Sequence, residues 1–144
     1  MATERKAEVT WQGDLMSGSG RIDSVSSGAI GNLDLDWHAR SEDAQSKTSP
    51  EELIAAAHAA CVSMALSHAL AQAGHPADEL KTSATVTFQP GEGITKVALT
   101  INGKVPGIDD DAFQEAAQTA KENCPVSKAL ASVPEISLDA RLQS

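Results

Sequence analysis

Two cysteines carry the most distinctive chemistry in this sequence. Cys61 lies in an apolar stretch, and Cys124 precedes a proline near the C-terminal end. A buried cysteine is most often a small apolar core residue, which is the simpler interpretation of Cys61. Cys124 differs, because a thiol at the start of a helix faces unsatisfied backbone N–H groups and the positive end of the helix dipole. Joint redox chemistry requires that the fold bring the two thiols together, because their separation excludes a CxxC motif.

Histidines near Cys61 offer a second kind of chemistry. His58 precedes Cys61 by three residues, so it shares a helix face with the thiol and could act as a base; His68 lies on the same side. A core histidine with a satisfied hydrogen bond is the commoner situation. A zinc site built from Cys61, Cys124, His58 and His38 is a further alternative, although the chain lacks the closely paired ligands typical of zinc sites.

The element expected to position Cys61 is a helix that runs from Pro50 to Ala71. Ser49 suits the N-cap, Pro50 the first helical position, and Glu52 the third position of a capping box. Gly74 marks the end. The segment is apolar in nearly every direction, which predicts burial in a core. Its many alanines would allow another helix or a sheet to approach closely, including across a dimer axis.

Strand patterns surround this helix. Alternation of apolar and polar residues predicts three strands in the first forty residues, the third covering residues 33–39 and ending beside Arg40. A hairpin follows over residues 84–101, then a helix from Asp109 to Asn123, a short helix that begins at Pro125 and has Cys124 as its N-cap, and a closing strand over residues 136–142. This order predicts an α+β fold with antiparallel sheet.

Composition limits the possible functions. A chain of 144 residues with 41% hydrophobic and 22% charged residues suits one globular domain. A formal charge of -9 makes nucleic acid an unexpected partner. The first eight residues lack the apolar core of a signal peptide, so we expect a cytoplasmic protein. Residues 53–71 approach the length of a membrane span, but their histidines and serines and the absence of basic flanks favour a buried helix and no membrane partner.

Two sequence blocks carry a family resemblance. Thr48–Cys61 reads TSPEELIAAAHAAC and Asn123–Ser127 reads NCPVS. The chain resembles the OsmC/Ohr family of thiol peroxidases, in its osmotically inducible (OsmC) branch, from Trp11 through Val105–Asp109 to the last strand. The resemblance implies a single OsmC/Ohr-like domain over residues 1–144. It also implies antiparallel sheets around a long buried central helix, in an intertwined homodimer.

The resemblance further implies a peroxidase. Cys61 would attack an organic hydroperoxide, or hydrogen peroxide, and become a sulfenic acid, which Cys124 would resolve as a disulfide. An arginine held by Glu51 would activate the thiolate; Arg40 is the first candidate and Arg21 the second. A dithiol would reduce the disulfide, and a lipoyl group serves in related proteins. The implied role is defence against oxidative and osmotic stress, with no bound cofactor, metal or flavin.

Helix geometry adds a constraint. A rise of about 1.5 Å per residue separates Glu51 from Cys61 by roughly 15 Å on a straight helix. Either the helix breaks or Glu51 serves the site differently. One solution is an antiparallel helix pair about a two-fold axis, which brings the first turn of one helix towards the middle of its partner. We therefore expect a homodimer with sites at its interface. The alternative to an enzyme is a stress-response domain that binds a hydrophobic ligand without catalysis, in which the cysteines serve packing only.

Overall fold

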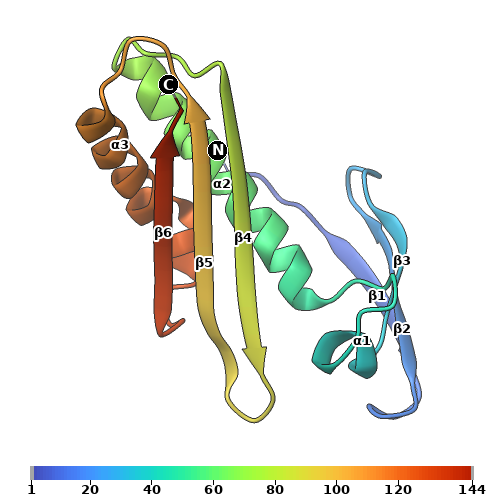
Figure 1. The fold of residues 1–144 in the computed structure, drawn as a ribbon. Coiled ribbons are helices and arrows are strands. Elements are labelled where there is room, and N and C mark those ends of the chain that lie inside the picture. Colours follow the sequence, from blue (N-terminus) through green and yellow to red (C-terminus); the bar gives the residue numbers. More distant parts are fainter. Residues whose placement is uncertain (1, 144) are drawn as a thin grey trace. The chain divides into compact units, whose positions relative to one another are not determined.

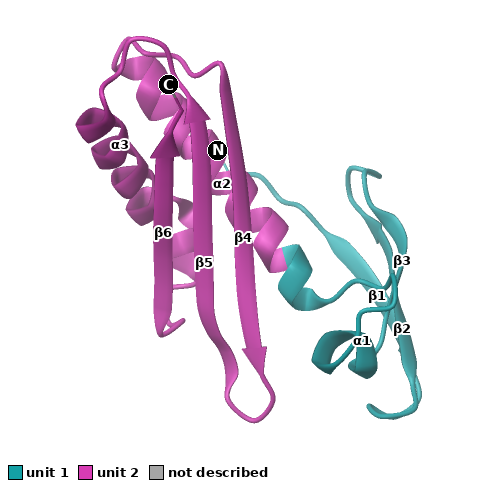
Figure 2. Ribbon diagram, in the orientation of Figure 1, with its two compact units in different colours: residues 1–53 teal, residues 54–144 magenta. Residues whose placement is uncertain are grey.

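The computed structural model describes residues 2–143, and the chain separates into two compact units, residues 1–53 and residues 54–144 (Figure 2). One helix, α2 (Pro50–Gln72), contributes its first turn to the first unit and the rest to the second. Strands and helices follow the predicted order, with one short helix added. The α+β fold class is therefore confirmed.

The first unit contains a three-stranded antiparallel sheet. Its strands lie in the order β1 (Ala7–Gln12), β2 (Ser19–Val25) and β3 (Gly31–Leu35). Ile22 of β2 is buried, whereas every residue of β1 is exposed. A single layer of three strands buries little apolar surface by itself.

The end of the third strand differs from the prediction. The strand stops at Leu35, and residues Trp37–Ser41 form a short helix, α1. Asp36 explains the change, because its carboxylate accepts a hydrogen bond from the Ala39 N–H at 2.7 Å and caps the helix. Arg40 consequently lies in the last turn of α1 and not at the end of a strand.

The predicted start of α2 is confirmed. The helix begins at Pro50, and the Ser49 hydroxyl accepts a hydrogen bond from the Glu52 N–H at 3.2 Å. Ser49 and Glu51 are buried at this end of the helix. At the other end, Gly74 takes a positive φ of 87°, which allows the chain to leave the helix without strain.

The second unit contains a sheet in the order β4 (Glu79–Gln89), β5 (Gly93–Lys104) and β6 (Glu135–Leu142). The hairpin β4–β5 is antiparallel, but β6 runs parallel to β5, contrary to the antiparallel prediction (Figure 1). Two helices between these strands, α3 (Asp110–Asn123) and α4 (Pro125–Ala129), return the chain to the end of the sheet where β5 began. A crossover of this kind produces parallel pairing.

The core of the second unit lies between helices α2 and α3 and one face of this sheet (Figure 1). Its fully or almost fully buried side chains come from α2, β5, α3 and the start of α4: Val62, Leu66, Leu70, Val97, Leu99, Ile101, Phe113, Ala117, Ala120 and Cys124. A Cβ on Gly103 would lie 2.7 Å from the Phe113 ring, so the missing side chain lets α3 approach the sheet.

Within the single chain, α2 is buried on one face. Ala56, Ala57, Ala60 and Met64 are exposed on the other, and Met64 exposes 73% of its surface. Among the described helices, α2 is the one with the length and hydropathy of a membrane span, and the side chains that it buries make it a core helix. Its opposite face is unusually apolar for a surface exposed to water.

Candidate active site

The fold brings the two cysteines together. Cys61 lies near the middle of α2 and is half-buried, and Cys124 is fully buried as the N-cap residue of α4. Both are free thiols; Cys61 packs against the core cluster that contains Cys124, and each thiol affects the pKa of the other. The structure therefore provides the contact that joint redox chemistry requires.

The surroundings of the two thiols differ. Burial raises the pKa of the Cys61 thiol, the hydrogen bond to Cys124 raises it further, and only the Val126 N–H acts in the opposite direction. Burial also opposes ionisation of Cys124, but hydrogen bonds from Cys61, from Ser127 and from Val126 lower its pKa. Within the second unit, Cys124 is thus the more acidic thiol, as expected at a helix start.

The two helices that carry the thiols are also joined by a buried polar pair, His58 and Ser127. His58 of α2 is 0% exposed, and its Nε2 atom lies 2.7 Å from the Ser127 hydroxyl of α4. The Nδ1 atom of His58 has no hydrogen-bond partner among the described residues. The expectation of a core histidine is thus met at one ring nitrogen and not at the other.

Arg40 and Glu51 form a buried ion pair in the first unit. Nε and Nη2 of Arg40 donate hydrogen bonds to Oε1 of Glu51 at 3.0 and 2.9 Å, and Nε also contacts Oε2 at 3.3 Å. The Glu51 side chain is 8% exposed, so the carboxylate holds the guanidinium in a fixed orientation. The structure joins these two predicted residues in one unit and the two cysteines in the other.

Arg40 also borders an apolar cavity of about 350 Å³. The cavity is lined mainly by aromatic and aliphatic side chains of the first unit: Trp11, Leu15, Leu35, Trp37 and Pro50, with Asp36 and Arg40 as the charged members. Trp11 is 38% exposed and lines this cavity.

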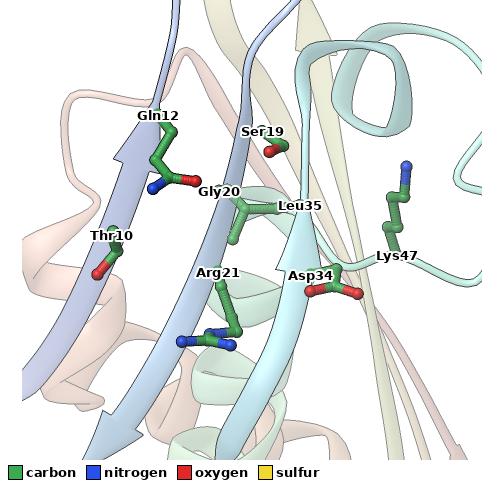
Figure 3. Close-up of a pocket in the computed structure, with 8 residues that line it drawn as sticks. All are labelled: Thr10, Gln12, Ser19, Gly20, Arg21, Asp34, Leu35 and Lys47. Carbon is green, nitrogen blue, oxygen red and sulfur yellow. The ribbon is translucent and has the colours of Figure 1, made fainter.

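Arg21, the second candidate, lies in a different pocket of the first unit (Figure 3). Its Nε atom donates to Asp23 at 3.0 Å, and its cross-strand neighbours are Thr10 and Asp34. The pocket is polar, and Lys47 contributes its other cationic side chain. Arg40 is therefore the arginine that contacts Glu51.

Sequence reasoning missed Ser127 as part of the site. Its signals in the sequence were its place at the end of the NCPVS block and, two residues after Pro125, in the first turn of the helix that Cys124 begins. Within residues 2–143, no group of three or more His, Cys, Asp or Glu side chains is arranged to hold an ion.

Comparison with known proteins finds one family and several relatives that match this chain. The family model for OsmC-like protein matches residues 39–139. Peroxiredoxin OsmC of Escherichia coli K12 is 42% identical over 147 residues, which is 100% of both chains. The organic hydroperoxide resistance protein OhrB of Bacillus subtilis is 29% identical over 68% of this chain and 73% of its own length.

Solved structures share the fold. The crystal structure of Bacillus subtilis OhrB matches with a TM-score of 0.63 and 27% identity, over 96% of this chain and 98% of the other. An OsmC-like protein of unknown function from Vibrio cholerae matches with a TM-score of 0.70 at 15% identity, over 96% and 99% of the two chains. Together with the sequence matches, these likenesses show that the chain belongs to the OsmC family.

Proposed function

We propose that this chain, a peroxidase of the OsmC family, reduces organic hydroperoxides through a redox cycle of Cys61 and Cys124. The observation that carries the proposal is the proximity of the two thiols, which lie more than sixty residues apart in the sequence, share one core cluster and affect each other's pKa. The names peroxiredoxin and organic hydroperoxide resistance protein of the relatives support the reaction class.

The proposed cycle has three steps. The Cys61 thiolate attacks the peroxide O–O bond, which breaks; the leaving oxygen takes a proton and departs as an alcohol, and Cys61 becomes a sulfenic acid. Cys124 then attacks the Cys61 sulfur, so that an S–S bond forms and water leaves. An external dithiol reduces the disulfide by exchange and is itself oxidised.

Arg40 and Glu51 serve the first step in this proposal. A guanidinium near Cys61 would favour the thiolate and stabilise charge that develops on the peroxide oxygen. Such a cation is needed because the second unit by itself raises the pKa of Cys61. The apolar cavity beside Arg40 offers space for the organic part of a hydroperoxide.

The working form in this proposal is a homodimer. Helix α2 is continuous from Pro50 to Gln72, so the roughly 15 Å of helix between Glu51 and Cys61 is not shortened by a break. A partner's Arg40–Glu51 pair can complete the site if two copies pack antiparallel. The exposed face of α2, with Ala56, Ala57, Ala60 and Met64, is the surface that we expect the partner to cover.

The proposal also covers the domain, the cellular location, the physiological role and the reductant. We propose a single functional domain over the whole chain, a cytoplasmic location where thiols stay reduced, and a role in defence against oxidative and osmotic stress. The reductant is a dithiol, for which a lipoylated protein is one source. Hydrogen peroxide is a second substrate, expected to react more slowly because it leaves the apolar cavity unfilled.

Turnover of cysteine variants tests the proposal. With dithiothreitol and tert-butyl hydroperoxide, Cys61→Ser should abolish peroxide consumption, because the attacking sulfur is lost. Without dithiothreitol, Cys124→Ser should react once with the hydroperoxide and then accumulate the Cys61 sulfenic acid, which dimedone labels. Unimpaired turnover by Cys61→Ser would contradict the assignment. Failure of the wild-type protein to consume either peroxide would instead favour a ligand-binding domain without catalysis.

A further inference from the structure

The polar pair behind the thiols joins two segments that are far apart in sequence. His58 and Ser127 are separated by 69 residues, and both lie in the core, with 0% and 8% exposure. Two polar side chains cost free energy to bury, whereas an apolar pair of similar volume would pack without any need for hydrogen bonds. Packing alone therefore does not require a polar pair at this position.

The tautomer of His58 follows from its surroundings. Burial lowers the pKa of His58, so the ring is neutral near pH 7 and carries one N–H. Nδ1 has no partner among the described residues, and a proton there would be a buried donor without an acceptor. A proton on Nε2 is instead donated to the Ser127 oxygen at 2.7 Å.

Because His58 donates to the Ser127 oxygen, the Ser127 hydroxyl proton is free to be donated to Cys124. A hydroxyl has one proton to donate, and here its oxygen already accepts from His58. Ser127 lies in the first turn of the helix that Cys124 begins, and its hydroxyl and backbone N–H both act to lower the pKa of the Cys124 thiol. The burial of Cys124 and its bonds from Cys61, Val126 and Ser127 are the influences on its ionisation in the described chain.

We propose that His58 is a positioning residue for the resolving step, which orients the Ser127 hydroxyl so that it donates to the Cys124 sulfur. The role rests on the proposed function. The Cys124 thiolate attacks the Cys61 sulfenic acid, the S–S bond forms as the S–O bond breaks, and the departing hydroxide leaves as water with the proton that Cys124 released. His58 therefore acts on Cys124 through Ser127 and touches neither peroxide nor Cys61.

The first measurement uses no peroxide. In the Cys61→Ser background, the pKa of Cys124 is followed by thiolate absorbance in Ser127→Ala, His58→Leu and His58→Gln, with exposed His68→Gln on the same helix as the matched control. Ser127→Ala and His58→Leu should raise the pKa by about one pH unit, because the thiolate loses an oriented donor. His58→Gln keeps an N–H donor near the same place and should restore the wild-type value, as should the control.

The second measurement separates the two chemical steps. After one equivalent of tert-butyl hydroperoxide, the wild type should form disulfide without accumulating sulfenic acid. Ser127→Ala and His58→Leu should accumulate sulfenic acid and form the disulfide about tenfold more slowly. A Cys124 pKa that is one pH unit higher leaves about a tenfold smaller fraction of thiolate, which is the attacking form. His58→Gln should resolve at the wild-type rate.

An unchanged Cys124 pKa and an unchanged resolution rate in folded Ser127→Ala would overturn this role. Circular dichroism checks folding, and if His58→Leu does not fold, Ser127→Ala and His58→Gln decide the question. If the wild type does not react with hydroperoxide, the proposed function fails, while the Cys124 pKa series still tests whether His58 and Ser127 act on that thiol.

Discussion

In the proposed cycle, Arg40 supplies the positive charge that favours the Cys61 thiolate. We expect Arg40→Ala to slow the reaction of Cys61 with an alkyl hydroperoxide by at least about tenfold and to raise the apparent pKa of that step, because a nearby cation favours the thiolate. Stopped-flow rates against pH provide the measurement. Arg40→Lys should retain part of the rate, since it keeps the charge but not the forked contact with Glu51.

Two controls separate this effect from loss of structure. Arg21→Ala removes an arginine that bonds to Asp23 and should leave the rate within about twofold. The double variant Arg40→Ala, Glu51→Gln removes both charges, so it should recover stability lost by leaving a buried carboxylate alone, yet remain slow. If the double variant reacted with hydroperoxide at the wild-type rate, Arg40 would have no part in the mechanism.

His58 also makes stability depend on pH. Burial lowers its pKa below 6.5 in the folded chain, so below about pH 6.5 the unfolded chain binds a proton that the folded chain does not. The unfolding free energy should therefore fall from pH 7 to pH 5, with a contribution of at most about 1.4 kcal/mol per pH unit from this group. Urea unfolding at several pH values should show a shallower slope in His58→Gln and the wild-type slope in His68→Gln.

At the scale of elements, the approach of α3 to the sheet depends on Gly103. A methyl group there would lie 2.7 Å from two atoms of the Phe113 ring, which is completely buried. We expect Gly103→Ala to destabilise the protein by about 1–3 kcal/mol in urea unfolding. Adding Phe113→Leu makes room, so the combined cost should be smaller than the sum of the single costs. Simple additivity would show that the ring and the strand do not constrain each other.

Local signals in the sequence were sufficient for most element boundaries. Ser49 caps α2 and Asp109 caps α3 through hydrogen bonds within one turn, and Pro125 stands at the first position of α4. The third strand was predicted too long because Trp37 and Ala39 fit strand alternation equally well, and only the Asp36 cap distinguishes a helix. The parallel pairing of β6 depends on the end of the sheet to which α3 and α4 return the chain, and the residue pattern of β6 itself does not determine that end.

The candidate site was only partly accessible from sequence. The contact of Arg40 with Glu51 was expected from the family resemblance and is present at 2.9 Å. Ser127 could not be recognised, because its role comes from a partner 69 residues away and serine is common in first turns of helices. Contacts between distant segments require packing information that local periodicity does not contain.

For the whole molecule, the proposed cycle needs two chains, because the Arg40–Glu51 pair of one chain completes the site at Cys61 of the other. Met64 is 73% exposed in the middle of an apolar helix face, so Met64→Lys should weaken a dimer that covers this face by placing a charge in its interface. Sedimentation should show mainly monomer, with peroxidase activity reduced in proportion to dissociation. Thr119→Lys, which adds the same charge at an exposed position of α3, should remain dimeric and active.

A monodisperse wild-type monomer with full activity would contradict this requirement. In that case Arg40 and Cys61 would have to meet within one chain, despite the length of continuous helix between Glu51 and Cys61. Activity that rises with protein concentration in parallel with the dimer fraction would support the shared site.

The most direct test of the proposed redox cycle of Cys61 and Cys124 is the intact mass of the protein after reaction with one equivalent of an alkyl hydroperoxide. We predict that the reduced wild type loses two hydrogen atoms and that peptide mapping finds Cys61 joined to Cys124, while Cys124→Ser gains one oxygen atom on Cys61. Dithiothreitol should restore the starting mass of the wild type. If both cysteines remain thiols after a competent hydroperoxide has been added, the redox cycle proposed for this chain is wrong.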